Sequence, residues 1–362
     1  MAVGHPETVA ATELFTTALR EFFTARRGEA DAIGAGVVRA VEELESYVLR
    51  GGKRVRPTFA WLGWLGAGGD PAGPTAPAVA RACAALELLH ASALIHDDII
   101  DASSTRRGFP AAHVTFAEQH REHGWSGDPV DYGTGTAILV GDLAQAWADD
   151  LIRTSGLPER AQARLGPVWS AMRTEVLCGQ LLDLTAEASG AEDIASALRV
   201  DQYKTASYTV ERPLHLGAAI AGADERLIAA YRAFGADIGI AFQLRDDLLG
   251  VFGDPVVTGK PSGDDLREGK RTVLLATALR RADECDPAGA GFLRAKIGTD
   301  IDEAELVTIR RVLVDTGAVD LVEQDIARRT ERALAALRTS GADEHARERL
   351  AAMAVSATQR IR

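Results

Sequence analysis

The sequence predicts an all-α protein, and three observations support that prediction. Apolar residues recur at helical spacing along most of the 362 residues, as in the stripe formed by Val41, Leu44 and Val48. Alternating apolar and polar patterns bounded by hairpin turns, the usual signature of strands, are absent. No internal repeat with a period of about 20–50 residues is present, which argues against a solenoid.

Helical patterns follow one another in order along the chain. Gly51 and Gly52 end the second of them, because glycine is a common stop just beyond a helix C-terminus. Loops that contain glycine and proline are expected at 66–77, 122–133 and 253–271, and a polar loop is expected at 102–110. Helical or apolar segments cover residues 7–27, 31–50, 59–65, 78–101, 134–155, 159–189, 192–210, 213–222, 224–252, 318–338 and 343–362.

Composition places the chain among soluble globular proteins, with one or two domains. It is 46% hydrophobic and 25% charged, which allows a large buried core. Three scattered cysteines fit neither a disulfide framework nor a paired-cysteine metal site, and they favour the reducing cytoplasm. The N-terminus lacks the basic and apolar segments of a signal peptide.

Charge and hydropathy argue against two other classes of protein, those that bind nucleic acid and those that span a membrane. The net charge of -12 argues against general nucleic-acid binding, which needs clustered lysine and arginine. No run of about 18 apolar residues is free of charges, so no membrane span is expected.

Three aspartates, Asp97, Asp98 and Asp101, lie at the end of the apolar segment 78–101. Asp97 and Asp101 are four residues apart, so on a helix both carboxylates project from one face. Three ionised acids this close repel one another, and burial strengthens the repulsion. Carboxylate oxygens suit Mg²⁺, which commonly bridges one or two carboxylates to substrate phosphates. We therefore expect a magnesium and phosphate site.

A second acidic pair, Asp246 and Asp247, ends the apolar segment 224–252. At a helix C-terminus the dipole disfavours bare anions and favours a bound cation. Both acidic clusters are followed by basic residues, as a diphosphate bound through Mg²⁺ would require. These basic residues are Arg106, Arg107, Lys260, Lys270 and Arg271.

Six sequence blocks, taken together, resemble the trans-isoprenyl diphosphate synthases, the polyprenyl synthetase family. The last block is most similar to that of bacterial geranylgeranyl diphosphate synthases. The blocks are GGKRVRP (51–57), ELLHASALIHDDIIDASSTRRG (87–108), GTAILVGD (135–142), GQLLDL (179–184), KTASYTVERPLHLGAAIAG (204–222) and FQLRDDLLGVFGDPVVTGKPSGDDLREGKRTVL (242–274).

The resemblance implies one isoprenoid-synthase domain over residues 1–362, a large helical bundle around a central cavity with its motifs in 51–274. It also implies a reaction between isopentenyl diphosphate and an allylic diphosphate, which is dimethylallyl, geranyl or farnesyl diphosphate. The allylic diphosphate ionises, the double bond of isopentenyl diphosphate attacks the carbocation, and a proton is lost. The expected product is geranylgeranyl diphosphate, with farnesyl or longer polyprenyl diphosphates as alternatives.

The resemblance also implies roles for individual residues. Asp97, Asp101 and Asp246 would bind Mg²⁺, supported by Asp98 and Asp247. Thr205 and Gln243 match positions whose oxygens face the developing cation, a role for preorganised dipoles. Lys53, Arg56, His90 and Arg107 match the isopentenyl diphosphate site, and Arg106, Lys204, Lys260 and Lys270 match the allylic diphosphate site.

The second acidic motif departs from the family's pattern, because Gly250 stands where a third aspartate is usual. We expect two acids to suffice, since Mg²⁺ readily takes water in place of a ligand. The alternative is that Asp254 reaches back across the turn between Gly250 and Gly253.

Small residues one turn before Asp97 are expected to set the product length. Ser92 and Ala93 leave a path open for the hydrocarbon tail, whereas an aromatic side chain there would block it. Two other functions compete with this interpretation: a terpene cyclase, which needs no second diphosphate site, and a non-catalytic synthase-like subunit. By analogy with relatives, we expect a homodimer.

Overall fold

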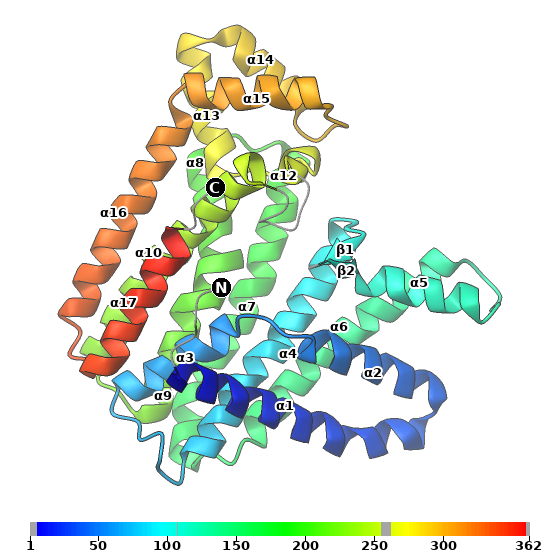
Figure 1. The fold of residues 1–362 in the computed structure, drawn as a ribbon, viewed down its shortest axis with the longest axis vertical. Coiled ribbons are helices and arrows are strands. Elements are labelled where there is room, and N and C mark those ends of the chain that lie inside the picture. The colour runs from blue at the N-terminus through cyan, green and yellow to red at the C-terminus, as the bar shows by residue number, and fades with distance from the viewer. Residues whose placement is uncertain (1–5, 107, 255–261, 360–362) are drawn as a thin grey trace. The chain divides into compact units, whose positions relative to one another are not determined.

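The computed structural model describes residues 6–106, 108–254 and 262–359 (Figure 1). It is helical almost throughout, which confirms the all-α prediction. The described residues contain one pair of strands, an antiparallel hairpin of β1 (Thr105–Arg106) and β2 (Phe109–Pro110). Each strand has only 2 residues, too few for an alternating pattern to show in the sequence.

The chain divides into two compact units, which are described separately. Unit 1 contains Met1–Val168 and Pro213–Ala223, and unit 2 contains Trp169–Arg212 and Asp224–Arg362. The boundary after Val168 falls within helix α7, one residue beyond Pro167.

Two of the helices that begin in unit 1, α4 and α6, are long and pack against each other, and α4 ends in the first acidic motif. In chain order the helices that begin in this unit are α1 (Pro6–Ile33), α2 (Ala35–Leu49), α3 (Val55–Gly66), α4 (Ala76–Ile100), α5 (Ala112–Glu122), α6 (Pro129–Arg153) and α7 (Glu159–Ser189). The helix α9 (Arg212–Ala221) also belongs here, except for its first residue.

Helix α4 is the centre of unit 1, because α1, α2, α3, α5 and α6 all pack against it. Aromatic rings join the surrounding helices to one another. Phe15 meets Trp61 edge to face with ring centroids 6.0 Å apart, and Phe23 meets Trp147 at the same centroid distance. Such buried aromatic pairs hold the scaffold that carries the acids at the end of α4.

Two helices, α4 and α10, are long and apolar enough to cross a membrane by length and composition alone. Their most apolar 18-residue windows have mean hydropathies of 1.5 and 1.2, and 72% and 50% of those windows are buried inside the structure. A buried core helix passes the same test, and α4 has that position in unit 1.

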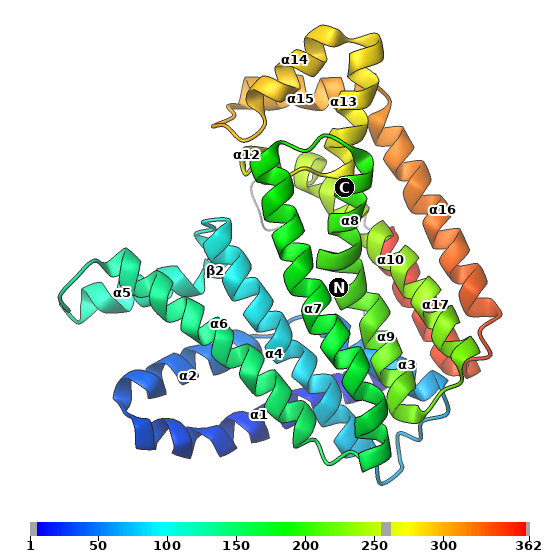
Figure 2. The same cartoon turned by 180° about the vertical axis from the view of Figure 1, so that it is seen from behind.

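Unit 2 is built around one long helix, α10. The remaining helices of this unit are α8 (Ile194–Val200), η1 (Asp201–Glu211), α10 (Glu225–Phe252), α12 (Asp264–Arg267), α13 (Val273–Cys285), α14 (Pro287–Lys296), α15 (Glu303–Asp315), α16 (Ala318–Arg338) and α17 (Glu344–Thr358). Helices α16 and α17 flank α10 in both views (Figure 1 and Figure 2).

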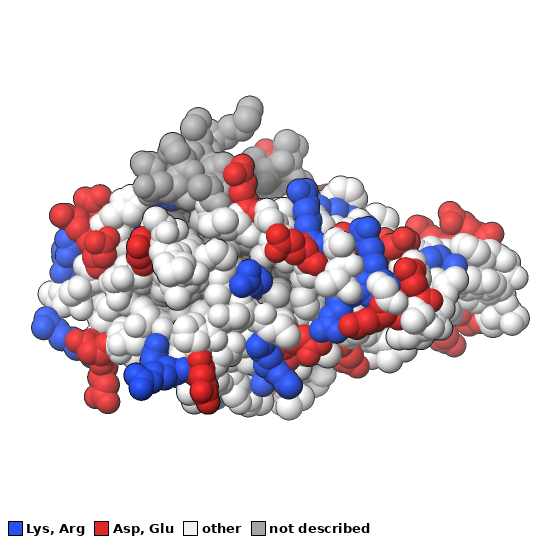
Figure 3. Space-filling view, turned by 90° about the horizontal axis from the view of Figure 1, so that it is seen from below, with Lys and Arg blue, Asp and Glu red and all other residues white. Residues whose placement is uncertain are grey.

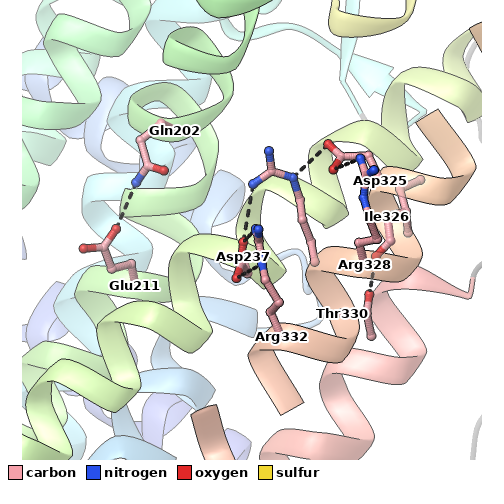
Figure 4. A network of polar contacts seen from close by, with 9 residues as sticks. Gln202, Glu211, Asp237, Asp325, Ile326, Arg328, Thr330 and Arg332 are labelled. Atoms are coloured by element: carbon pink, nitrogen blue, oxygen red, sulfur yellow. Dashed lines mark hydrogen bonds and ion pairs between the residues drawn. The ribbon is translucent and has the colours of Figure 1, made fainter. Parts of the chain in front are cut away.

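Ion pairs fix α16 to α10, as Figure 4 shows. Arg332 Nε donates to Asp237 Oδ2 of α10 at 3.1 Å, and Arg329 Nη1 donates to Asp237 Oδ1 at 3.4 Å. Within α16, Arg329 Nε also donates to Asp325 Oδ2 at 2.9 Å. Burial would raise the pKa of Asp325, but hydrogen bonds from Arg329 and Arg328 outweigh that effect and lower it. The side of α10 opposite η1 is therefore held by charge as well as by apolar packing.

The segment expected as one helix over 192–210 is instead α8 followed by η1, whose 11 residues wind as a π-helix. Two glycines let neighbouring helices approach its backbone closely. A Cβ on Gly179 of α7 would lie 2.3 Å from Lys204 N, and one on Gly239 of α10 would lie 2.4 Å from Ala206 Cα. π-Helical turns are rare and often occur at functional sites. Here the turn carries Lys204 and Thr205.

Candidate active site

The first acidic motif lies at the end of α4. Asp101 caps the helix, and its N–H donates to Asp97 O at 2.8 Å. The two carboxylates expected to bind Mg²⁺ thus come from one turn of a fixed helix end. Asp98 differs from both, because its side chain is fully buried.

Arg106 of β1 is paired with these acids. Its Nε donates to Asp98 Oδ1 at 2.7 Å, and its Nη2 lies 3.3 Å from Asp97 Oδ2 and also contacts Asp98. Burial raises the pKa of Asp98, and Arg106 opposes part of that shift. The short hairpin therefore brings a compensating cation to the motif, and Arg106 links the acids to the diphosphate site expected around it.

The segment GGKRVRP is held in place by Arg54, which the sequence did not single out. Arg54 has φ 46° and is 4% exposed, and its guanidinium pairs with Glu87 of α4. Its carbonyl accepts from Thr58 Oγ1 at 2.7 Å. A buried Arg54 fixes its neighbours Lys53, which is exposed, and Arg56, which is half-buried.

The other predicted residues of unit 1 lie along α4. His90 and Ala93 are half-buried, whereas Ser92 is 2% exposed and belongs to the packed interior. Ala93 is therefore the more accessible of the two positions expected to set product length. Arg107 lies outside the described residues.

In unit 2, three predicted residues form one hydrogen-bonded chain. Thr205 Oγ1 donates to Gln243 Oε1 at 2.8 Å, and Gln243 Nε2 donates to Asp247 Oδ1 at 2.7 Å. Gln243 and Asp247 are four residues apart on α10, and Thr205 approaches from η1. These two hydrogen bonds fix the orientation of the Gln243 amide.

Lys204, next to Thr205, pairs with the carboxylate of Asp183 on α7. Lys270 Nζ lies 3.3 Å from Glu268 Oε2. Asp246 is half-buried on α10, and Lys260 lies outside the described residues.

Asp247 is 4% exposed, and its Oδ2 has no hydrogen-bond partner. Burial raises its pKa well above the ordinary value, and the nearby Asp201 raises it further. Asp201 was not predicted from the sequence; it is 5% exposed, and burial, followed by the charge of Asp183, raises its pKa to about 8. Among the residues described, no lysine or arginine forms an ion pair with Asp247.

The acids of both motifs suit Mg²⁺ bound together with a diphosphate. Among the described residues, no group of three acidic, histidine or cysteine side chains could hold a metal ion without further ligands. Mg²⁺ usually binds through one or two carboxylates, waters and substrate phosphate, so such a group is not required. In unit 2 the buried Oδ2 of Asp247 has no hydrogen-bond partner, so a proton or a bound cation would stabilise it.

An all-α chain with two helices ending in aspartates, and with lysines and arginines beside them, belongs to the class of helical prenyltransferases. The family model described as polyprenyl synthetase matches residues 38–309. The chain therefore belongs to the polyprenyl synthetase family, and it is an enzyme that transfers prenyl groups.

Solved structures and characterised relatives agree with this assignment. The structure of geranylgeranyl pyrophosphate synthase from Corynebacterium glutamicum, complexed with isoprenyl diphosphate and magnesium, is 47% identical with a TM-score of 0.93, covering 97% of this chain and 99% of that one. Geranylfarnesyl diphosphate synthase of Aeropyrum pernix is 35% identical over 78% of this chain and 82% of its own. Geranylgeranyl diphosphate synthase of Mycobacterium tuberculosis is 34% identical over 79% and 75%.

Proposed function

We propose that this chain condenses isopentenyl diphosphate with an allylic diphosphate, in a reaction that requires Mg²⁺, and that its main product is geranylgeranyl diphosphate. One observation supports this most strongly. The chain has the three acids of the first motif, two acids of the second and the basic residues expected for both diphosphate sites, and it is similar over 97% of its length to a geranylgeranyl pyrophosphate synthase. Because the family match spans parts of both units, we also propose that 1–362 acts as one synthase domain.

The acids would hold the metal. Asp97 and Asp101 of unit 1 and Asp246 of unit 2 are the ligands in this proposal, with Asp98 and Asp247 in support. Bound Mg²⁺ supplies Lewis-acid neutralisation of the leaving diphosphate. Asp98 supports Asp97 by holding Arg106 beside it.

The remaining residues bind and orient the two substrates. Lys204, Arg106, Lys260 and Lys270 hold the allylic diphosphate, whose C1–O bond breaks to release diphosphate. Lys53, Arg56, His90 and Arg107 hold isopentenyl diphosphate, whose double bond attacks C1 before a proton leaves the new chain. The oxygens of Thr205 and Gln243 are fixed by their hydrogen bonds, and they stabilise the positive charge that develops on C1 of the allylic substrate.

Product length depends on α4 in this proposal. Ala93 is half-buried one turn before Asp97, so Ala93→Phe should shorten the main product. Ser92→Phe is a poorer test, because Ser92 is 2% exposed and the larger side chain would overpack the interior. Chromatography of dephosphorylated products from each starter measures the length, and an unchanged length for a folded Ala93→Phe variant contradicts this geometry.

We further propose a cytoplasmic homodimer with no membrane span and no nucleic-acid partner. Helix α6 exposes apolar side chains, among them Val130 at 57% and Leu139 at 68%, which suits a protein interface. Figure 3 shows lysines and arginines interspersed with aspartates and glutamates on one face, unlike the basic patch of a nucleic-acid site. Light scattering of the pure protein, compared with Leu139→Glu, tests the dimer; a monomeric parent protein would contradict it.

Turnover separates the proposed function from its rivals. The pure protein should consume isopentenyl diphosphate only with an allylic partner and Mg²⁺, and chelation should stop it. A terpene cyclase would consume the allylic diphosphate alone and release a hydrocarbon. A non-catalytic subunit would be inactive in every mixture.

A further inference from the structure

The π-helix η1 is long for its kind, and its last backbone hydrogen bond shows the register directly. π-Helical turns in proteins are mostly single turns inserted in α-helices. The helix η1 instead extends over 11 residues, Asp201–Glu211. Immediately after it, the N–H of Arg212 donates to Ser207 O, five residues earlier, as the π-helical pattern requires. So long a segment in a rare register needs side-chain contacts that select it over an α-helix.

The carboxylate of Glu175 on α7 binds the side chains of both residues in that last hydrogen bond. Arg212 Nε donates to Glu175 Oε2 at 2.8 Å, and Arg212 Nη2 contacts Oε1. Ser207 Oγ donates to the same Oε2. In an α-helix, residues five apart lie about 140° from each other around the axis, so their side chains point in different directions. In a π-helix, whose hydrogen bonds join residues five apart, they lie nearly one above the other and can share one carboxylate.

A second contact spans almost the whole length of η1. Gln202 Nε2 donates to Glu211 Oε2 at 3.0 Å, across 9 positions of the chain (Figure 4). The same separation is about two and a half turns of an α-helix, which would place the two side chains on opposite faces. In the wider π-helix it is about two turns, so both side chains lie on one face. The acceptor is itself fixed, because Glu211 is 5% exposed and its Oε1 accepts from Arg232 Nε of α10 at 2.9 Å.

Glycines on the neighbouring helices make room for the wide backbone of η1. A Cβ on Gly235 of α10 would lie 2.4 Å from Glu211 Cα, which adds a third close approach to those of Gly179 and Gly239. A larger residue at any of the three positions would collide with η1. The surfaces of α7 and α10 therefore fit η1 in its present register over most of its length.

The register determines where Lys204 and Thr205 point. Lys204 pairs with Asp183 of α7, and Thr205 Oγ1 donates to Gln243 Oε1 of α10 at 2.8 Å. Thr205 lies seven residues before Arg212. That separation is about two turns of an α-helix but roughly one and a half turns of a π-helix. A change of register would therefore turn Thr205 away from Gln243 even if the C-terminal end of the segment stayed in place.

We propose that Glu175 and Gln202 are positioning residues, which select the π-helical register of η1 and thereby aim Lys204 and Thr205 at the reacting end of the allylic substrate. The proposal rests on the proposed function and adds to it two residues that act through others. Both lie outside the six sequence blocks that carry the family resemblance. Their role depends on the fold, since Glu175 and Ser207 are 32 positions apart in the chain.

Hydrogen exchange and steady-state kinetics of Glu175→Gln and Gln202→Leu test the proposal. Mass spectrometry should show faster amide exchange over residues 201–211 than in the parent protein, with exchange in α16 unchanged. The kcat should fall about ten- to a hundredfold, as expected for a displacement of about 1 Å at the reacting atoms. The KM for isopentenyl diphosphate should not change, because its proposed site lies in unit 1. Glu159→Gln, the same change at an exposed position of α7, should match the parent protein in every measurement.

A reciprocal exchange provides the rescue. Gln202→Glu combined with Glu211→Gln restores an amide–carboxylate hydrogen bond between the same two positions, and it should recover most of the kcat lost in Gln202→Leu. Faster exchange without a loss of kcat would overturn the positioning role. A lower kcat without faster exchange, or a folded double variant without recovery, would overturn the selection of the register. If the parent protein transfers no prenyl group, the proposed function is wrong, whereas exchange in η1 still decides whether the two residues hold its register.

Discussion

The two acidic motifs look alike in the sequence, yet their charges are compensated differently. In unit 1 the buried Asp98 is paired with Arg106 from a two-stranded hairpin. In unit 2 the buried Asp247 has the neutral amide of Gln243 as its partner, and Asp201, Asp265 and Asp246 lie near it.

This difference indicates different roles for the two helix ends. In the first motif the buried Asp98 already has a cation beside it, so it needs no metal ion for its own charge balance. The buried Asp247, with which no described lysine or arginine forms an ion pair, needs a proton or a metal ion to offset its charge. We infer that the second motif depends more strongly on Mg²⁺ for its charge balance, and four predictions test this comparison.

The largest effect is expected on turnover. Asp97→Asn and Asp246→Asn each remove a proposed ligand, and the loss of several kcal/mol of Lewis-acid stabilisation corresponds to roughly 10³- to 10⁴-fold in kcat. Steady-state assays with saturating Mg²⁺ measure it. Asp149→Asn on α6, a change outside both motifs, serves as the control, and a loss of less than tenfold in either motif variant would remove that acid from the metal site.

The second prediction concerns pH. The folded protein keeps the Asp201 proton up to a pKa of about 8, whereas the ordinary value is 3.8, so the parent protein should lose stability as pH rises between these values. Asp201→Asn removes the share of this dependence that Asp201 contributes, which is on the order of 4 kcal/mol between pH 5 and pH 8. Urea unfolding at pH 5 and pH 8 without metal measures it, and parallel pH profiles for the two proteins would refute the assignment.

Third, Arg106→Met should destabilise unit 1. It leaves the fully buried Asp98 without its cation, at a cost of about 3–4 kcal/mol in the free energy of unfolding. Adding Asp98→Asn should recover much of the stability but not the activity. If Arg106→Met unfolds like the parent protein, Arg106 does not compensate Asp98.

The smallest effect is expected for Gln243→Leu in unit 2. It removes the only hydrogen bond that the structure gives the Asp247 side chain among the described residues, which should cost about 1–3 kcal/mol. Calorimetric unfolding of this variant beside Arg106→Met gives the comparison directly. A larger loss for Gln243→Leu would reverse the contrast between the motifs.

Much of the fold could be predicted because helix periodicity and stop signals are local. The expected segments 159–189 and 318–338 coincide with α7 and α16. The loop expected at 253–271 contains the short helix α12, and the segment 192–210 winds partly as a π-helix. These differences arise from tertiary contacts, such as the close approach of Gly179 and Gly239 to η1.

For the candidate site, sequence patterns predicted which residues take part but not which side chains they contact. Asp97, Thr205 and Gln243 belong to recognisable motifs, whereas the Gln243 bond to Thr205 joins residues 38 positions apart. Asp201 carried no local signal, because its raised pKa depends on burial and on the charge that the folded chain places beside it. Sequence patterns therefore predicted which acids to examine, and the structure showed how each is compensated.

The central claim, prenyl transfer from an allylic diphosphate to isopentenyl diphosphate, is tested most directly by stoichiometry. Purified protein with farnesyl diphosphate, labelled isopentenyl diphosphate and Mg²⁺ should release one inorganic diphosphate for each isopentenyl unit incorporated, and dephosphorylation should yield geranylgeraniol. Release of diphosphate without incorporation of label, or no reaction with either substrate, would contradict the account.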